Sequence, residues 1–193
     1  MTPSFLVPIE YVYNDRPGVV MEFLRPLRDG GEVACGFVPG QGSKGIVYAA
    51  FDERKRGNEY TDWRFRAMPK SDIWYNYYEI WRPLEGRNEC LLFRAYFHVY
   101  LAIQSRELVP FACLHCDPNE TPLDENDERE VRTCSYKRGP HLHVLRADDP
   151  MPSSHFPLNL GHLTAVLGSA ESITTAMKTS IDVIHYELVK KWA

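Results

Sequence analysis

Alternating apolar and polar positions dominate the middle of the chain. Three runs rich in aromatic and β-branched residues follow one another, at 73–83 (IWYNYYEIWRP), 90–103 (CLLFRAYFHVYLAI) and 107–116 (ELVPFACLHC). Short polar connections at 84–87 and 104–106 separate them, a spacing typical of strands joined by tight turns. The pattern predicts an antiparallel β-meander.

Weaker strand patterns flank this meander. Residues 9–27 (IEYVYNDRPGVVMEFLRPL) contain two β-rich runs around a turn cluster at 14–18, which predicts a β-hairpin. Residues 37–51 (FVPGQGSKGIVYAAF) repeat the pattern, with glycines before a run of apolar residues. A fourth run after the meander, at 130–136 (EVRTCSY), is also predicted to be a strand.

The hydrophobic period changes near the C-terminus. After Ser169, a residue type that caps helices, apolar residues recur at helical spacing: Ile173, Met177, Ile181, Ile184 and Leu188. A shorter helical turn is expected at 161–167. We therefore predict an α+β fold, a largely antiparallel β-sheet meander packed by a C-terminal amphipathic helix. The 193 residues are expected to form one domain, 1–193, with an N-terminal hairpin subdomain within 1–70.

Composition narrows the function classes. A net charge of −4 excludes a globally basic nucleic-acid wrapper but allows a local basic face. No run approaches the roughly 20 apolar residues that span a bilayer, and residues 1–13 lack the features of a secretory signal, so a cytoplasmic protein without membrane contact is expected. The five cysteines are odd in number and lie in apolar or strand-like runs, which favours reduced thiols over disulfides.

Three histidines lie in one short stretch, residues 136–158 (YKRGPHLHVLRADDPMPSSHFPL). If residues 140–145 are extended, the side-chain period of two puts His141 and His143 on the same face, about 7 Å apart along the strand. The prolines that follow require the chain to turn, so His155 could return toward that face. We expect the three imidazoles to converge.

Two chemistries suit such a cluster. In the first, His141, His143 and His155 act as acid and base on a phosphodiester, without a metal, while Lys137 and Arg138 hold the phosphate. In the second, the same three histidines bind zinc and leave a position open for water. The basic pair beside the histidines favours the first reading. Purely structural histidines are the alternative to both.

A second constellation is FACLHCDP, at 111–118. Alternation puts Cys113 and His115 on one strand face, so a mixed site with His141 and His143 on a neighbouring strand is geometrically feasible. The alternative is a buried thiol and a strand-end histidine. Asp117 is a carboxylate that could orient an imidazole.

A third candidate is the basic and aromatic segment 52–70 (DERKRGNEYTDWRFRAMPK). Trp63, Arg64 and Arg66 combine a stacking ring with two cations, a mixture that binds single-stranded nucleic acid. The alternative is a solvated loop with cation–π packing on Trp63.

The element Tyr-Lys-Arg-Gly-Pro-His at 136–141, with a later proline-flanked histidine, resembles the ends of TumE-type toxin proteins of bacterial toxin–antitoxin systems. The resemblance covers about 25 residues and carries over to Pro140, His141 and His155. It implies an RNA-directed toxin activity and an antitoxin-like inhibitor as protein partner.

Three function classes remain at this stage. They are a nucleic-acid-directed phosphodiesterase, most simply an RNA-cleaving toxin or defence protein, a zinc-dependent hydrolase, and a non-catalytic subunit of a larger protein or protein–nucleic-acid assembly. His98 and His185 are expected to be packing or surface residues that at most contact the site.

Overall fold

A computed structural model of the chain describes residues 6–28, 32–38, 45–52, 59–68, 71–103, 107–121, 126–144, 154–158 and 163–190. The strands of this part of the chain are β1 Val7–Pro8, β2 Ala34–Phe37, β3 Ile46–Phe51, β4 Phe65–Arg66, β5 Ile73–Pro83, β6 Glu89–Ala102, β7 Leu108–Cys116, β8 His141–Val144 and β9 Ser154–Pro157. The helices are α1 Ile9–Asn14, α2 Arg16–Leu24, α3 Glu128–Arg138, α4 Leu163–Val166 and α5 Ala170–His185, with short turns η1 Arg25–Leu27, η2 Tyr60–Asp62 and η4 Tyr186–Lys190.

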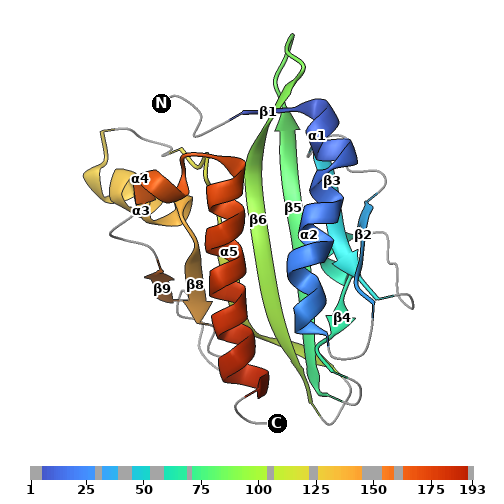
Figure 1. Ribbon diagram of the computed structural model, residues 1–193. Helices are drawn as coiled ribbons and strands as arrows, with labels where there is room; N and C mark the ends of the chain where they lie inside the picture. The colour runs from blue at the N-terminus through green and yellow to red at the C-terminus, as the bar shows by residue number, and fades with distance from the viewer. Residues whose placement is uncertain are drawn as a thin grey trace.

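The strands form one sheet in the order β2-β3-β5-β6-β7-β8-β9, with β1 paired to β6 and β4 to β5. Every pairing within the described ranges is antiparallel. The long strands β5 and β6 lie at its centre, and α2 and α5 cross the same face (Figure 1). The predicted α+β class and the meander of β5, β6 and β7 are thus confirmed.

The C-terminal helix forms as its apolar period predicts. The Ser169 side chain caps α5 by accepting a hydrogen bond from the Ser172 amide at 3.1 Å. Ile173, Met177 and Ile181 are buried against the sheet. None of the helices in the described ranges is long and apolar enough to cross a membrane.

Two predicted strand regions are helical, and both predictions are wrong. The expected hairpin at 9–27 is α1 and α2, because Val20, Phe23 and Leu24 follow a helical period and Pro17 lies in the first turn of α2, where its missing amide hydrogen costs nothing. The expected strand at 130–136 belongs to α3, which has Lys137 and Arg138 in its last turn, where the helix dipole favours positive charge.

Each face of the sheet has its own packing. The face under α2 and α5 carries the larger core, in which Tyr77, Phe97 and Leu114 pack with the apolar side of α5. Because neighbouring residues of a strand point to opposite faces, Tyr78 and Tyr96 lie on the other side of the sheet, in or against a smaller cluster. We call this second side the far face.

A glycine in a left-handed conformation precedes β3. Gly45 has φ of 110°, and a Cβ there would lie 2.3 Å from the carbonyl oxygen of Trp81 on β5. We expect Gly45→Ala to lower the free energy of unfolding by about 1 to 3 kcal/mol, measured by denaturant titration. Gly18→Ala, in an exposed position of α2 with no atom within 4 Å of the new Cβ, should instead stabilise by up to about 1 kcal/mol. Equal effects at both positions would contradict this account.

Candidate metal centre

Side chains of the types that bind transition metals gather on the far face, across three adjacent strands. They are His98 on β6, Cys113 and His115 on β7, and His141 and His143 on β8, and together they are called the histidine cluster. The strand register explains the gathering, because directly opposed residues of an antiparallel sheet share a face. His98, Cys113 and His143 are opposed in one row, and His115 and His141 in the next.

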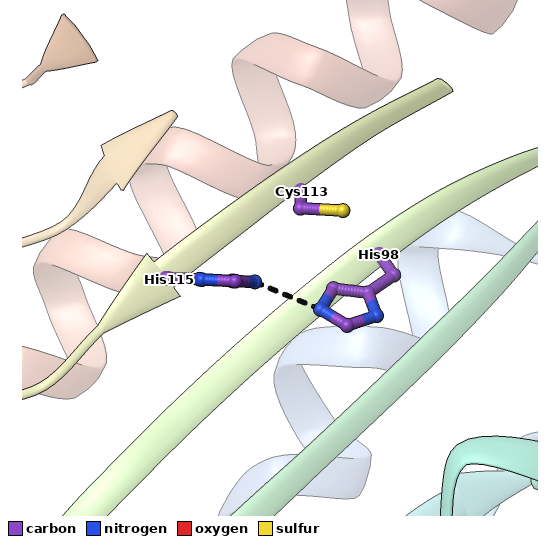
Figure 2. Close-up of side chains that lie close together, drawn as sticks. All are labelled: His98, Cys113 and His115. Atoms are coloured by element: carbon purple, nitrogen blue, oxygen red, sulfur yellow. Dashed lines mark hydrogen bonds between the residues drawn. The ribbon is translucent and has the colours of Figure 1, made fainter. Parts of the chain in front are cut away.

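One half of the cluster joins β6 and β7. The Nε2 atoms of His98 and His115 lie 2.9 Å apart and share one hydrogen, and Cys113 lies beside them (Figure 2). The possible ligand atoms of these three residues all lie within 4.8 Å of one another. In Figure 2 the helices lie behind the strands, so the three side chains project from the face that α2 and α5 leave uncovered.

The other half joins β7 and β8 through the same residue, His115. Its ring centroid lies 4.1 Å from that of His143 and 5.9 Å from that of His141, and the two β8 rings are 4.9 Å apart. The possible ligand atoms of these three histidines also lie within 4.8 Å of one another. His115 therefore belongs to both groups of three.

Tyrosines hold the cluster in place. The Tyr96 ring stacks on His115, with centroids 3.7 Å apart and planes 6° apart. The Tyr96 hydroxyl donates a 2.6 Å hydrogen bond to Asp117, and the Tyr100 hydroxyl lies 3.3 Å from Nδ1 of His98. The stacking on Tyr96 and the contact with Tyr100 orient the His115 and His98 rings, respectively.

The His141 ring is oriented by its backbone. Its Nδ1 lies 2.9 Å from the carbonyl oxygen of Gly139, so Nδ1 carries the hydrogen and donates it. This tautomer leaves the lone pair on Nε2, which lies 4.0 Å from Asp117. A histidine that donates one ring hydrogen to a carbonyl while offering the other nitrogen is the arrangement found at protein metal sites.

Burial keeps at least two of these imidazoles neutral. It lowers the pKa of His98 to about 4, with the charge of Arg64 as the second cause. It also lowers the pKa of His115 to about 2, and the neighbouring histidines and Arg94 add to the effect. Burial raises the pKa of the Cys113 thiol to about 11 and that of Asp117 to about 6, the latter opposed by the hydrogen bond from Tyr96. Neutral imidazole is the form that binds metals.

The donor set suits a tetrahedral ion such as zinc. Zinc takes imidazole nitrogen and thiolate sulfur, and its bond lengths place ligand atoms roughly 3.3 to 3.8 Å apart. The 4.8 Å limit within each group of three means that side-chain adjustments of about 1 Å would complete either set. A metal ion would deprotonate the thiol that it binds, which removes the obstacle of the raised Cys113 pKa.

The structure brings together part of the predicted constellation. His141 and His143 share a face as expected, and the mixed arrangement with Cys113 and His115 is present. The backbone of His155 pairs with His143 in the ladder of β8 and β9, but its side chain lies outside the described part of the chain. The third converging ring that the structure does describe is His115.

His98 lies within the cluster, although it was expected to be a packing or surface residue that at most contacts the site. It was missed because its place in the cluster follows from the pairing of β6 with β7, which sets His98 opposite Cys113. The recurrence of a histidine on both strands was the available signal. His185 does pack as expected, because it is buried at the end of α5 with Nδ1 2.8 Å from the Tyr75 hydroxyl.

The predicted phosphate-binding pair is placed differently from the expectation. Lys137 and Arg138 end α3 instead of preceding His141 along a strand. Arg138 donates a 2.9 Å hydrogen bond to the carbonyl oxygen of Pro118, and the carbonyl oxygen of Lys137 accepts one from the Asp117 amide. Both residues thereby position the loop that carries Asp117.

The basic and aromatic segment 52–70 also differs in part from the expectation. Trp63 is 3% exposed and packs edge-on against Phe51, so its ring is not presented for stacking as predicted. The Arg64 guanidinium lies over the Tyr100 ring at 4.4 Å, and that of Arg66 lies over Trp74 at 4.6 Å. The remaining cations of the segment lie outside the described residues: Arg54, Lys55, Arg56 and Lys70.

The far face thus combines the histidine cluster with arginines at both ends. The charge of Arg64 contributes to the lowered pKa of His98, and the charge of Arg94 contributes to that of His115. The Arg94 guanidinium also lies 3.6 Å from Asp117.

The chain matches no protein-family model, no curated protein and no solved structure.

Proposed function

We propose that the protein is a metal-dependent hydrolase that binds a zinc-type ion at the histidine cluster and cleaves phosphodiesters, with single-stranded RNA as the substrate. The observation that carries the proposal is the convergence of four imidazoles and a thiol from three adjacent strands. Such a density of nitrogen and sulfur donors is costly to bury unless it serves a site.

Two of the four imidazoles, His98 and His115, are in a charge state that suits a metal ligand and does not suit a general acid. A metal-free mechanism needs one protonated and one neutral imidazole near neutral pH. The pKa of His98 is about 4 and that of His115 about 2, both lowered mainly by burial, so these two rings bind no extra proton there. Neutral rings serve as ligands and fail as acids.

An anionic substrate fits the surroundings. Arg64 and Arg94 lie at the two ends of the cluster, and a phosphodiester carries the complementary charge. In the reaction, water forms a new bond to phosphorus and the bond to the leaving oxygen breaks; one proton of the water passes to that oxygen and the other remains with the product phosphate. A bound divalent ion would supply the Lewis acid for this step.

The cellular setting is part of the proposal. The described residues include all five cysteines and show no disulfide between them, which favours the reducing cytoplasm as the place where the protein acts. An RNA-cleaving enzyme in that compartment requires control, so we propose a protein partner that acts as an antitoxin-like inhibitor.

Metal analysis together with an RNA cleavage assay tests the function. We expect close to one zinc ion per chain, cleavage of single-stranded RNA that EDTA abolishes and added zinc restores, and loss of both properties when His115, which belongs to both groups of three possible ligands, is changed to alanine. His185→Phe is the matched control, because it removes an imidazole from the opposite face while keeping an aromatic ring beside Tyr75. It should retain metal and activity.

Other outcomes would redirect the proposal. Cleavage that persists in EDTA with only trace metal would favour the metal-free mechanism with His141, His143 and His155. Absence of both metal and cleavage, in protein shown to be folded, would leave the non-catalytic subunit.

A further inference from the structure

The far face also holds a cavity of about 490 Å³. Its walls include Arg64, Arg66, Trp74, Ile103 and Leu108. The volume lies within the roughly 300 to 1,000 Å³ of small-molecule sites and accommodates a single nucleotide.

Two guanidinium groups lie side by side at this cavity. Trp74 and Tyr100 are directly opposed on β5 and β6, and each ring carries an arginine over its face. Arg66 lies over Trp74 at 4.6 Å and Arg64 over Tyr100 at 4.4 Å. Because the two rings are neighbours and both arginines line the cavity, two positive charges face the same space.

Each of the two arginines has a hydrogen-bond donor without an acceptor in the described part of the chain. Within the described residues, the Nε atoms of Arg64 and Arg66 are buried and make no hydrogen bond. Buried donors of this kind call for an acceptor. Asp72 is the one carboxylate among the described residues of the wall, so the cavity keeps an excess of positive charge.

We propose that this cavity binds a nucleotide, with its phosphate held by Arg64 and Arg66 and its base against Trp74, Ile103 and Leu108. The inference rests on the proposed function in one respect, namely that the nucleotide belongs to the RNA substrate or its product. The cavity connects to the cluster through Tyr100, which carries Arg64 on its ring and contacts His98 with its hydroxyl.

The chemistry of the walls selects this class of ligand. A pair of guanidiniums matches the oxygens of a phosphate, to which arginine donates two parallel hydrogen bonds. Planar guanidinium and indole groups, with the apolar side chains of Ile103 and Leu108, suit the flat face of a base. Inorganic phosphate has no base and a nucleoside has no phosphate, so neither would contact both the arginine pair and the apolar wall.

Calorimetric titration of the metal-free protein in EDTA tests the proposal without relying on catalysis. Adenosine 5′-monophosphate should bind, and adenosine and inorganic phosphate should each bind about 10-fold or more weakly. Arg66→Gln should weaken nucleotide binding by about 10- to 100-fold, because it removes a charge-assisted hydrogen bond. Leu108→Trp should weaken it as well, because the larger ring fills the cavity and leaves both arginines unchanged. Thermal unfolding checks that each variant is folded.

Arg87→Gln is the matched control, because Arg87 is 63% exposed in the turn between β5 and β6 and lies outside the cavity wall. It should bind the nucleotide as the parent does. The proposal is overturned if the nucleotide does not bind at millimolar concentration, if phosphate alone binds equally well, if Arg87→Gln loses as much affinity as Arg66→Gln, or if folded Leu108→Trp keeps full affinity. Metal content and RNA cleavage are measured separately. Absence of nucleotide binding would therefore not contradict the metal centre, and absence of a metal would not contradict nucleotide binding.

Discussion

His115→Ala should reduce bound zinc from close to one ion per chain to trace amounts and lower metal-dependent RNA cleavage by about 10³-fold or more. His115 is the residue shared by the two groups of three possible ligands, so its loss leaves neither group with three. A metal that supplies several kcal/mol of transition-state stabilisation accounts for the size of the effect, at about 1.4 kcal/mol for each factor of ten.

Two further variants identify which half of the cluster holds the ion. If the ion is bound by His98, Cys113 and His115, then His98→Ala loses it and His141→Ala keeps it. If the ion lies between His115 and the β8 histidines, the two results are reversed. Elemental analysis after dialysis gives the ratio of metal to protein for each variant.

Tyr96→Phe is the control for packing around His115. The ring that stacks on His115 at 3.7 Å is kept, and the hydroxyl that bonds Asp117 is removed. The variant should retain its ion, with affinity reduced by about 10- to 100-fold at most, the usual cost of losing a contact that orients a ligand. A folded His115→Ala protein that still binds one ion per chain would refute a site that depends on this residue.

The sheet could be predicted because its central strands have a strong pattern of their own. In β5, the residues under the helices, such as Tyr75 and Tyr77, alternate with far-face residues such as Asn76 and Tyr78, and both sets contain aromatic residues. A run of this length with so many aromatic residues fits a strand that packs on both faces. No tertiary information was needed.

The N-terminal helices could not be predicted from the same kind of pattern. Val19 and Val20 have β-branched side chains, and the preceding Asp-Arg-Pro-Gly resembles a turn. Their helical form is stabilised by burial of Val20 and Leu24 against the sheet, where tertiary packing outweighs local preference. A proline in the first turn was the local feature that fitted both interpretations.

The histidine cluster could be predicted from the sequence only in part. The spacing of two places His141 beside His143 and Cys113 beside His115, and the sequence shows both pairs. The contribution of His98 from a third strand depends on how β6 pairs with β7, and the register of this pair shifts between Val99 and Tyr100. An irregularity of one residue decides whether His98 faces the cluster or the helices, and no local pattern fixes it.

A buried carboxylate under α2 and α5 was missed altogether. Glu79 is fully buried in β5 and accepts two hydrogen bonds from Arg16, at 2.6 and 3.0 Å. It also accepts from the hydroxyls of Tyr48 and Tyr77 and from the indole of Trp81. A glutamate inside the run YYEIW was a signal in itself, because a charge within an apolar strand requires a partner.

This network joins three parts of the fold. Arg16 belongs to α2, Glu79 to β5, and the remaining Arg16 nitrogen donates a 2.5 Å hydrogen bond to Thr174 of α5. The two helices are therefore tied to the sheet through one guanidinium, and the pair is inaccessible to solvent, with side chains 2% and 0% exposed. Its role is to fix the position of the helices, since no substrate can reach it.

Glu79→Ala should lower the free energy of unfolding by about 3 to 5 kcal/mol, a large part of the roughly 5 to 15 kcal/mol typical of a folded domain. The variant leaves the Arg16 charge buried without its carboxylate, together with the Tyr48, Tyr77 and Trp81 donors that Glu79 satisfied. Denaturant titration followed by circular dichroism measures the loss.

A double variant separates loss of the pair from loss of one partner. Replacing both groups with apolar residues of similar size, as Arg16→Met with Glu79→Leu, should cost less than Glu79→Ala alone, because no unpaired charge remains in the core. A double variant at least as unstable as the sum of the single variants would contradict the importance of the unpaired charge.

The same pair predicts how stability depends on pH. Burial acts to raise the pKa of Glu79, but the Arg16 charge and the hydrogen bonds outweigh it and hold the pKa below its ordinary value of 4.5. A carboxyl group whose pKa is lower in the folded than in the unfolded state contributes its full stabilisation above the unfolded value, and this contribution is lost as pH falls through the folded value. Below about pH 4.5 the parent protein should therefore lose stability more steeply than Glu79→Gln, whose amide does not titrate. Urea titrations between pH 7 and pH 3 should show the two curves converging, and parallel curves over that range would mean that Glu79 does not carry the charge assigned to it.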